Sequence, residues 1–374
     1  MSIHLQKERV SPVVVEDWEK LAKEVLPKGA YDYVNSGSGG EETLAKNVEE
    51  FKKWDLVPRV LVNVEKRNLS IELLNRKLAA PILLAPVGFQ TVVHPDGELA
   101  SARAAAGQSI PFITSTVSSY SLEEISGVMG NTPRYFQLYW PNDDEVASSF
   151  VKRAEASGYG AIVVTVDTPL LGWREKDLQN KYFPMMTGAG IANFVSDPVF
   201  NQKFNANGTL NKEAVIGEIR KILFKQNLTW EKLAWLRKQT SLPILLKGIM
   251  HKDDALQAIA NGIDGIVVSN HGGRQLDGVR SSLRALESIA DVVNKRIAVL
   301  FDGGIRRGPD VLKALALGAD GVLLGRPYVY GLAQGEVGVT SVLTNLLDDL
   351  DNSLANVGKN SITSINKSII EKHS

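Results

Sequence analysis

The sequence contains no cysteine, which excludes disulfide bonds, thiolate metal sites and cysteine nucleophiles and is typical of a reducing compartment. No uninterrupted apolar run approaches the roughly 18 residues of a transmembrane helix, and the first residues lack the apolar core of a signal peptide. Neither sign of charge is in surplus, because 42 Lys and Arg balance 42 Asp and Glu. We therefore expect a cytoplasmic protein with neither nucleic acid nor membrane as a partner.

Histidine is also scarce, with 5 residues, and none has partners at the spacing of a metal site, so we predict no metal. What the chain does have is apolar residues, which make up 44% of it, beside 22% charged residues. These proportions are typical of a globular enzyme with a large core.

Eight short apolar runs follow residue 80, and most are separated by a segment of helix-forming composition. The runs cover residues 82–85, 112–115, 135–138, 162–166, 244–246, 265–268, 298–301 and 321–324. The intervening helices are expected at 98–106, 122–129, 143–156, 230–237, 253–260 and 309–317. This alternation predicts an α/β protein with a (β/α)₈ TIM barrel, and a doubly wound parallel sheet is the alternative.

The sequence divides into three parts around that barrel. Residues 1–79 are expected to form N-terminal helices and a hairpin that pack on it, 80–356 the barrel itself, and 357–374 a tail for surface packing or subunit contacts. The interval after the fourth strand is too long for an ordinary loop and is rich in Gly and Asn. We predict that residues 175–228 form a structureless active-site lid.

Polar residues follow the strands at matching positions. They are Gln137, Asp167, Lys247, His271, Asp302 and Arg326. In a barrel the carboxyl ends of all strands meet at one mouth, so these side chains are expected to converge. His271 and Arg274 lie three residues apart and could accept a proton and bind a carboxylate, respectively.

The last two strands carry a separate signal, because Gly303-Gly304-Ile305-Arg306 and Gly325-Arg326 follow them directly. Backbone N–H groups and guanidiniums after strands seven and eight are where barrels bind phosphate. The sequence therefore indicates a phosphorylated ligand.

Five motifs together resemble the FMN-dependent L-2-hydroxy acid oxidising enzymes, and most closely the lactate oxidase and lactate 2-monooxygenase branch. The resemblance runs from about residue 12 to past residue 330, with the motifs in family order. The motifs are Tyr31-Asp32-Tyr33, Gln137-Leu138-Tyr139, Thr165-Val166-Asp167-Thr168-Pro169, Ser269-Asn270-His271-Gly272-Gly273-Arg274 and Asp302-Gly303-Gly304-Ile305-Arg306.

The resemblance implies FMN as the cofactor and assigns the residues that would hold it. Lys247 would lie beside flavin N1 and O2, where its charge stabilises the reduced ring. The full set of expected FMN-binding residues is Pro86, Val87, Gly88, Ser115, Gln137, Thr165, Lys247, Ser269, Asp302, Gly303, Gly304, Arg306, Gly325 and Arg326. Of these, Gly304, Arg306, Gly325 and Arg326 would bind the FMN phosphate, together with backbone N–H groups of their loops.

The resemblance also assigns the substrate site. Arg274 and Arg174 would bind the substrate carboxylate, with hydroxyl groups from Tyr33 and Tyr139 nearby. His271 would be the catalytic base. Asp167 would orient it and stabilise the imidazolium. Whether the base removes the α-proton or the hydroxyl proton stays open, because both routes need the same residue.

Gly88 leads us to expect a lactate 2-monooxygenase. Peroxide-releasing oxidases of this family commonly have Ala at this position, whereas lactate 2-monooxygenases resemble this chain in having Gly. Extra room beside flavin N5 would retain pyruvate while O₂ reacts, giving acetate and CO₂ from L-lactate. An oxidase that releases pyruvate and H₂O₂ is the alternative, and a non-catalytic phosphate-binding barrel is a weaker one. Family members assemble as tetramers or octamers, so a homotetramer or homo-octamer is expected.

Overall fold

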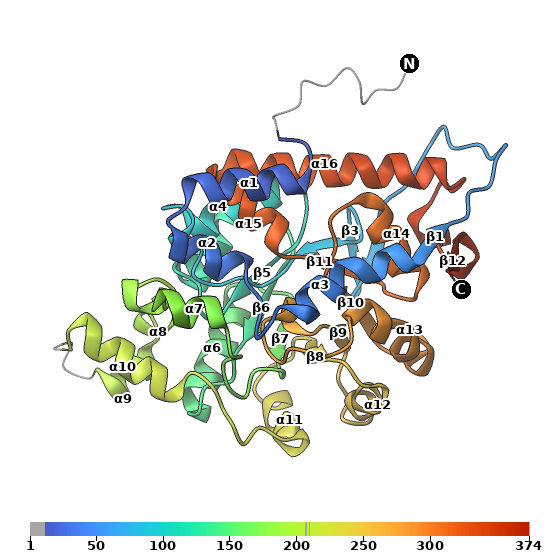
Figure 1. Cartoon of the computed structure of the whole chain (residues 1–374). Coiled ribbons are helices and arrows are strands. Elements are labelled where there is room, and N and C mark those ends of the chain that lie inside the picture. Colours follow the sequence, from blue (N-terminus) through green and yellow to red (C-terminus); the bar gives the residue numbers. More distant parts are fainter. Residues whose placement is uncertain (1–11, 206–207, 209, 374) are drawn as a thin grey trace.

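The computed structural model describes residues 12–205, 208 and 210–373, and its centre is a closed barrel of eight parallel strands (Figure 1). The barrel closes because its last strand pairs with its first, with Val322 lying opposite Ile82. The barrel excludes the doubly wound sheet and confirms the predicted fold. Its strands are β4 (Ile82–Leu84), β5 (Phe112–Ser115), β6 (Arg134–Leu138), β7 (Ile162–Thr165), β8 (Ile244–Ile249), β9 (Gly265–Val268), β10 (Ala298–Asp302) and β11 (Gly321–Leu324).

Alternate residues of these strands fill two cores, as the two-residue period of a strand requires. One set points into the barrel and includes Leu83, Val163 and Leu300, while the other packs outward against the helices. The antiparallel hairpin of β2 (Ile71–Leu73) and β3 (Arg76–Leu78) adds Leu73 and Leu78 to the interior set. The hairpin therefore closes the amino end of the barrel and leaves the carboxyl end open.

The helices that cover the barrel begin and end within two residues of the predicted bounds where a prediction was made. These are α4 (Gly97–Gly107), α5 (Leu122–Met129), α6 (Asp144–Ala156), α11 (Trp230–Arg237), α12 (Lys252–Ala260) and α14 (Gly308–Ala316). Three further helices, α13 (Ser282–Val293), α15 (Arg326–Leu332) and α16 (Gly335–Asn356), were not predicted from the sequence. None of the described helices is long and apolar enough to cross a membrane.

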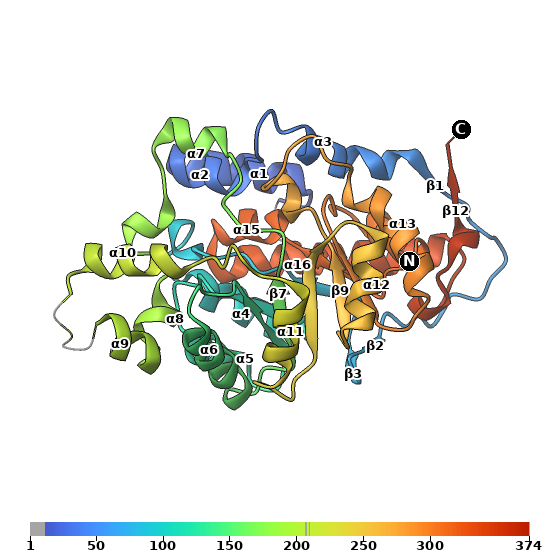
Figure 2. The same ribbon diagram turned by 90° about the horizontal axis from the view of Figure 1, so that it is seen from below.

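The two ends of the chain pack on each other beside the barrel. The N-terminal part forms α1 (Val15–Val25), α2 (Lys28–Asn35), α3 (Glu42–Glu49), the 3₁₀ turn η2 (Glu50–Lys53) and β1 (Trp54–Leu56). β1 pairs antiparallel with β12 (Ile370–Lys372) of the tail (Figure 2), and Ile362 and Ile369 of the tail are buried. The tail therefore has a core role that its polar composition did not reveal. Residues 1–11 lie outside the described part of the N-terminal region.

The insertion after β7 contains several helices, so the expectation that it is structureless was wrong; its role as an active-site lid stays a prediction. It contains α7 (Glu175–Asn180), η4 (Pro184–Thr187), α8 (Ala192–Val195), α9 (Pro198–Phe204) and α10 (Lys212–Ile222). Figure 2 shows these helices projecting from one side of the barrel, with α7 lying on α2. Asn180 donates to Asp32 at 2.7 Å, which joins α7 to α2.

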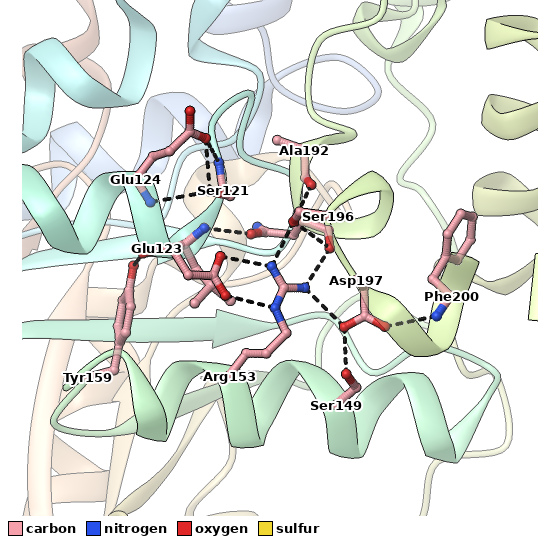
Figure 3. Close-up of polar contacts among 12 residues, drawn as sticks. Ser121, Glu123, Glu124, Ser149, Arg153, Tyr159, Ala192, Ser196, Asp197 and Phe200 are labelled. Atoms are coloured by element: carbon pink, nitrogen blue, oxygen red, sulfur yellow. Dashed lines mark hydrogen bonds and ion pairs between the residues drawn. The ribbon is translucent and has the colours of Figure 1, made fainter. Parts of the chain in front are cut away.

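The base of the insertion is fixed by a partly buried ion-pair cluster centred on Arg153 of α6 (Figure 3). The Arg153 guanidinium donates to both carboxylate oxygens of Glu123, at 2.8 and 2.9 Å, and to Asp197 at 3.0 Å. Asp197 is fully buried and also caps α9 by accepting from the backbone N–H of Phe200. Because one guanidinium holds α5, α8 and α9 together, this part of the insertion is anchored to the barrel helices.

Replacing Arg153 by Met should destabilise the protein by about 3–5 kcal/mol, because the buried carboxylate of Asp197 loses its cation. Chemical denaturation measures this loss. Arg307→Gln is the matched control, because its ion pair with Glu16 has side chains that are 52% and 49% exposed and should contribute less than about 1 kcal/mol. Equal effects of the two substitutions would contradict the anchoring role of Arg153.

Candidate active site

A cavity of about 680 Å³ opens at the carboxyl ends of the strands. Most residues expected at the site line it: Tyr33, Pro86, Val87, Gly88, Ser115, Tyr139, Arg174, Lys247, His271, Arg274, Asp302, Gly303, Gly304, Arg306, Gly325 and Arg326. Four further expected residues lie behind the side chains that line the cavity and are linked to them by hydrogen bonds. They are Asp167, Gln137, Thr165 and Ser269. The structure thus brings the predicted residues together from all eight strand ends.

His271 and Asp167 form a buried pair between the ends of β9 and β7. The Nδ1 atom of His271 lies 2.8 Å from Asp167 Oδ1. A carboxylate can only accept, so Nδ1 carries the hydrogen and Nε2 of the neutral ring keeps its lone pair. Nε2 faces the cavity and lies 3.4 Å from the hydroxyl of Tyr139. His271 adopts a left-handed backbone, φ 59°, which the 3.0 Å bond from its N–H to Ser269 Oγ supports.

Burial and charge together keep this pair in the form that can accept a proton. Burial lowers the pKa of His271, and the opposing effect of Asp167 does not fully compensate, so the pKa stays below its ordinary value. Burial raises the pKa of Asp167, but the interactions with His271 and Lys247 outweigh it and the net pKa is lowered. At neutral pH the imidazole is therefore neutral and the carboxylate ionised.

Lys247 is a buried cation at the floor of the cavity. Its Nζ donates to Ser269 Oγ at 3.0 Å and lies 3.2 Å from a carboxylate oxygen of Asp302. Burial lowers the pKa of Lys247, but the carboxylates of Asp302 and Asp167 more than compensate, so the net pKa is raised. The other carboxylate oxygen of Asp302 is buried and has no hydrogen-bond partner among the described residues.

Two neighbouring arginines line the cavity. Arg274 donates to the carbonyls of Tyr33 and Ser36 at 2.6 and 2.8 Å, and its guanidinium lies over the Tyr33 ring, 4.8 Å from its centre. Arg174, at the start of α7, donates through Nε to the carbonyl of Arg274 at 3.2 Å. Burial and the nearby Arg174 lower the pKa of Arg274 to about 9, so Arg274 remains a cation at neutral pH. The two guanidiniums can bind an anion together.

Arg326, expected at a phosphate, instead binds the carboxyl end of α2. Its guanidinium donates to the carbonyls of Val34, Asn35, Ser36 and Gly272 at 2.8 to 3.2 Å. This contact satisfies the last carbonyls of α2 and places a charge of the favourable sign at the negative end of the helix. Arg326 thereby docks α2, which carries Tyr33, on the mouth of the barrel; its contact with a phosphate stays a prediction.

A chain of polar side chains crosses the ends of β5, β6 and β7. Ser115 Oγ donates to Gln137 Oε1 at 3.1 Å, and Gln137 Nε2 donates to Thr165 Oγ1 at 3.0 Å. All three side chains are buried. This fixed row of donors and acceptors under one wall of the cavity is suited to the polar edge of a planar heterocycle.

The site fits FMN on features of its own residues. The unpartnered oxygen of Asp302 needs a donor, which the hydroxyl groups of a ribityl chain would supply. Gly303 and Gly304, both at positive φ, bring the backbone close to the cavity. At Gly304 a Cβ would come 2.0 Å from the carbonyl of Asn47, so only glycine fits.

The space beside Gly88 is filled rather than open. A Cβ on Gly88 would meet Val117 Cγ2 at 2.5 Å and the Val117 carbonyl at 2.6 Å. The missing methyl therefore makes room for the backbone after β5 and not for a bound product. This observation removes the physical argument that favoured a monooxygenase.

Three contributions to the site were not predicted from the sequence. Asp177 of α7 lines the cavity, and Oδ1 of its carboxylate is buried without a partner among the described residues. Phe224 packs edge-on against Tyr139, with ring centres 5.2 Å apart. Asn47 of α3 and Asn270 exchange two side-chain hydrogen bonds of 2.8 Å, which tie the N-terminal helices to the loop of His271. Apart from the charge of Asp177, nothing in the local sequence indicated these contacts.

A sequence model described as FMN-dependent dehydrogenase matches residues 22–372. The chain belongs to this family. An L-lactate oxidase of Lysinibacillus sphaericus is 46% identical over 94% of this chain and 90% of its own length. The human 2-hydroxyacid oxidase 1 is 40% identical, over 96% and 97% of the two chains. The crystal structure of a mandelate oxidase, 37% identical, superposes with a TM-score of 0.87 over 97% of this chain and 99% of that one.

Membership of the FMN-dependent dehydrogenase family makes the protein a flavin enzyme that oxidises an L-2-hydroxy acid, with FMN as its cofactor. The non-catalytic barrel is thereby excluded. The similar proteins named above are oxidases, which favours the alternative product outcome over the monooxygenase that Gly88 had suggested.

Gly304→Ala should impair FMN binding and destabilise the protein by about 1–3 kcal/mol, because a left-handed backbone and the Asn47 carbonyl both exclude a Cβ. Titration of the apoprotein with FMN, followed by flavin fluorescence, measures the affinity. Gly217→Ala is the control, since no atom lies within 4 Å of a Cβ at that helix position. Wild-type affinity in the Gly304 variant would refute the assignment of this loop to FMN.

Proposed function

We propose that the protein is an L-2-hydroxy acid oxidase that converts L-lactate and O₂ into pyruvate and H₂O₂. The observation that carries this proposal is the neutral His271 ring, held by Asp167 at 2.8 Å, in the same cavity as the Arg274 and Arg174 guanidiniums. Oxidation of a 2-hydroxy acid needs a proton acceptor and a carboxylate-binding site within one small molecule's length of each other.

In this proposal His271 accepts the substrate proton at Nε2. The lone pair of that atom faces the cavity, and the ring cannot turn because Nδ1 is bonded to Asp167. As the proton arrives, the ionised Asp167 stabilises the imidazolium at 2.8 Å, a pair whose attraction burial strengthens. The Tyr139 hydroxyl, 3.4 Å from Nε2, would bond the substrate hydroxyl and set its direction.

The substrate carboxylate would lie between Arg274 and Arg174, with the Tyr33 hydroxyl as a further donor. The carbonyls of Tyr33 and Ser36 fix the Arg274 guanidinium before substrate binds, so little side-chain entropy is lost on binding. Arg174 directly precedes α7 at the start of the insertion, so this segment supplies half of the proposed anion site.

FMN would lie against Val87 and Gly88 and be held by the Ser115–Gln137–Thr165 row, by Lys247 and Asp302, and by Gly303, Gly304, Arg306, Gly325 and Arg326. When bound it takes up the two electrons of the oxidation and passes them to O₂. The buried ammonium of Lys247 lies where it would stabilise negative charge on the ring. Ser269 would set the position of that ammonium through its 3.0 Å hydrogen bond.

Two findings support an oxidase over a lactate 2-monooxygenase. Val117 fills the space beside Gly88, so the missing methyl gives pyruvate no extra room. Two similar proteins, of Lysinibacillus sphaericus and of Nostoc, are named L-lactate oxidases. The cytoplasmic location and the homotetramer or homo-octamer stay predictions.

His271→Gln should reduce the rate of flavin reduction by L-lactate by about 10²- to 10⁴-fold while FMN stays bound, because the amide cannot accept the proton. Anaerobic stopped-flow absorbance measures the rate, and the flavin spectrum reports occupancy. His251→Gln is the control: this histidine caps α12 outside the cavity and should leave the rate unchanged. A His271 variant that reduces its flavin at the wild-type rate would eliminate His271 as the base.

The products distinguish the two outcomes. Wild-type enzyme given L-lactate and O₂ without catalase should form one pyruvate and one H₂O₂ for each lactate consumed. Acetate and CO₂ should be absent when a peroxide scavenger is present from the start, because free peroxide also decarboxylates pyruvate slowly in solution. Stoichiometric acetate and CO₂ despite the scavenger would establish the monooxygenase instead.

A further inference from the structure

A buried carboxylate lies behind the proposed flavin wall and has no part in the proposed chemistry. Glu98 of α4 is fully buried, and its Oε1 accepts the backbone N–H of Gln90 at 3.0 Å. Its Oε2 has no hydrogen-bond partner among the described residues. A buried charge with so little compensation is costly, so its position calls for a physical explanation.

Glu98 connects to the cavity through Gln90, whose backbone binds the carboxylate and whose side chain reaches the cavity wall. The Gln90 amide donates to the Val87 carbonyl at 2.9 Å and to the Tyr328 hydroxyl at 3.1 Å. The Tyr328 hydroxyl in turn donates to the Ala85 carbonyl at 3.0 Å. The carboxylate therefore supports, through one intervening residue, the segment 85–88 that follows β4 and lines the cavity.

Among the described residues, no cation forms an ion pair with Glu98. The titratable side chains that face it are Tyr120 and Tyr328, and burial raises the pKa of both, so both are neutral. Arg103, the basic residue of α4, is directed to Glu336 and Asp96 instead. Burial raises the pKa of Glu98 to about 7, and the backbone N–H groups around it only partly oppose the shift.

We propose that Glu98 is a positioning residue for the flavin: it holds the 85–88 segment through Gln90, and its charge opposes the negative charge that FMN gains on reduction. This rests on the proposed position of FMN against Val87 and Gly88. Two electrons enter the flavin, from substrate in turnover or from an electrode in the test. Glu98 then takes up one proton from solvent, which removes the repulsion.

The direction of the pH effect follows from the raised pKa. Below the ordinary pKa of a carboxyl group Glu98 is protonated in folded and unfolded chains alike, and it imposes no charge on the site. Between the ordinary pKa of 4.5 and about 7, the unfolded chain has ionised Glu98 while the folded protein keeps it protonated, so stability falls over this range. Above about 7 the folded protein carries the buried charge, which makes the flavin harder to reduce. A neutral residue of the same shape should not show either change.

Spectroelectrochemical titration of the FMN-loaded enzyme, at about pH 5.5 and about pH 8.5 on either side of that pKa, tests the proposal. Wild type and Glu98→Gln should have equal reduction potentials at the lower pH. At the higher pH the equilibrium constant for reduction should be about tenfold more favourable in Glu98→Gln. Thermal unfolding should show the same pattern, with the variant gaining stability over wild type only as pH rises.

Ser101→Ala is the matched control, because it removes a 2.7 Å hydrogen bond to the same Gln90 side chain without changing a charge. The flavin reduction potential of this variant should change between the two pH values by the same amount as that of wild type. A difference between Glu98→Gln and wild type that is the same at both pH values, or absent at both, would overturn the proposal.

A second measurement uses the wild-type enzyme and does not depend on the variant folding. Infrared difference spectra on electrochemical reduction at neutral pH should show a protonated-carboxyl band that shifts when the protein is labelled with ¹³C-glutamate. Absence of such a band would overturn the proposal. Neither measurement uses L-lactate or O₂, so their outcome is independent of whether the proposed oxidase activity is correct.

Discussion

The hydrogen bond between His271 and Asp167 is the interaction around which the site is built. The two residues are far apart in the sequence and meet because β7, β8 and β9 are neighbours in one closed sheet with fixed register. Burial lowers the pKa of the imidazole and the carboxylate opposes this shift, so the ring is neutral and can accept a proton. Every proposed role of the surrounding residues depends on a base in that state.

The cations of the site are placed mainly by backbone carbonyls. Arg274 and Arg326 both donate to the end of α2, and Arg174 donates to the carbonyl of Arg274. These contacts join the barrel, the N-terminal helices and the insertion at one point. A buried guanidinium is stable only when its N–H groups are hydrogen-bonded. The contacts that join these three parts of the chain therefore also fix the guanidiniums of the proposed anion site.

The barrel and most of the site could be predicted because their signals are local. Strand bounds at β9 and β11 were predicted to the residue, and the strand-end residues His271 and Lys247 lie in the cavity as expected. The rest depends on contacts between distant segments. The helices of the insertion, the docking of Arg326 on α2, the Asn47–Asn270 exchange and the packing of Val117 against Gly88 each require knowledge of what lies opposite in space. The contact between Val117 and Gly88, which the sequence does not show, removes the physical argument that led from Gly88 to the product.

The central claim is that a base, two guanidiniums and FMN share one mouth of the barrel and act on an L-2-hydroxy acid. Anaerobic mixing of the wild-type enzyme with L-lactate, followed by flavin absorbance and compared with D-lactate, tests it most directly. L-lactate should bleach the flavin within the enzyme's turnover time, and D-lactate should not. A flavin that stays oxidised with L-lactate and with other small L-2-hydroxy acids would contradict it.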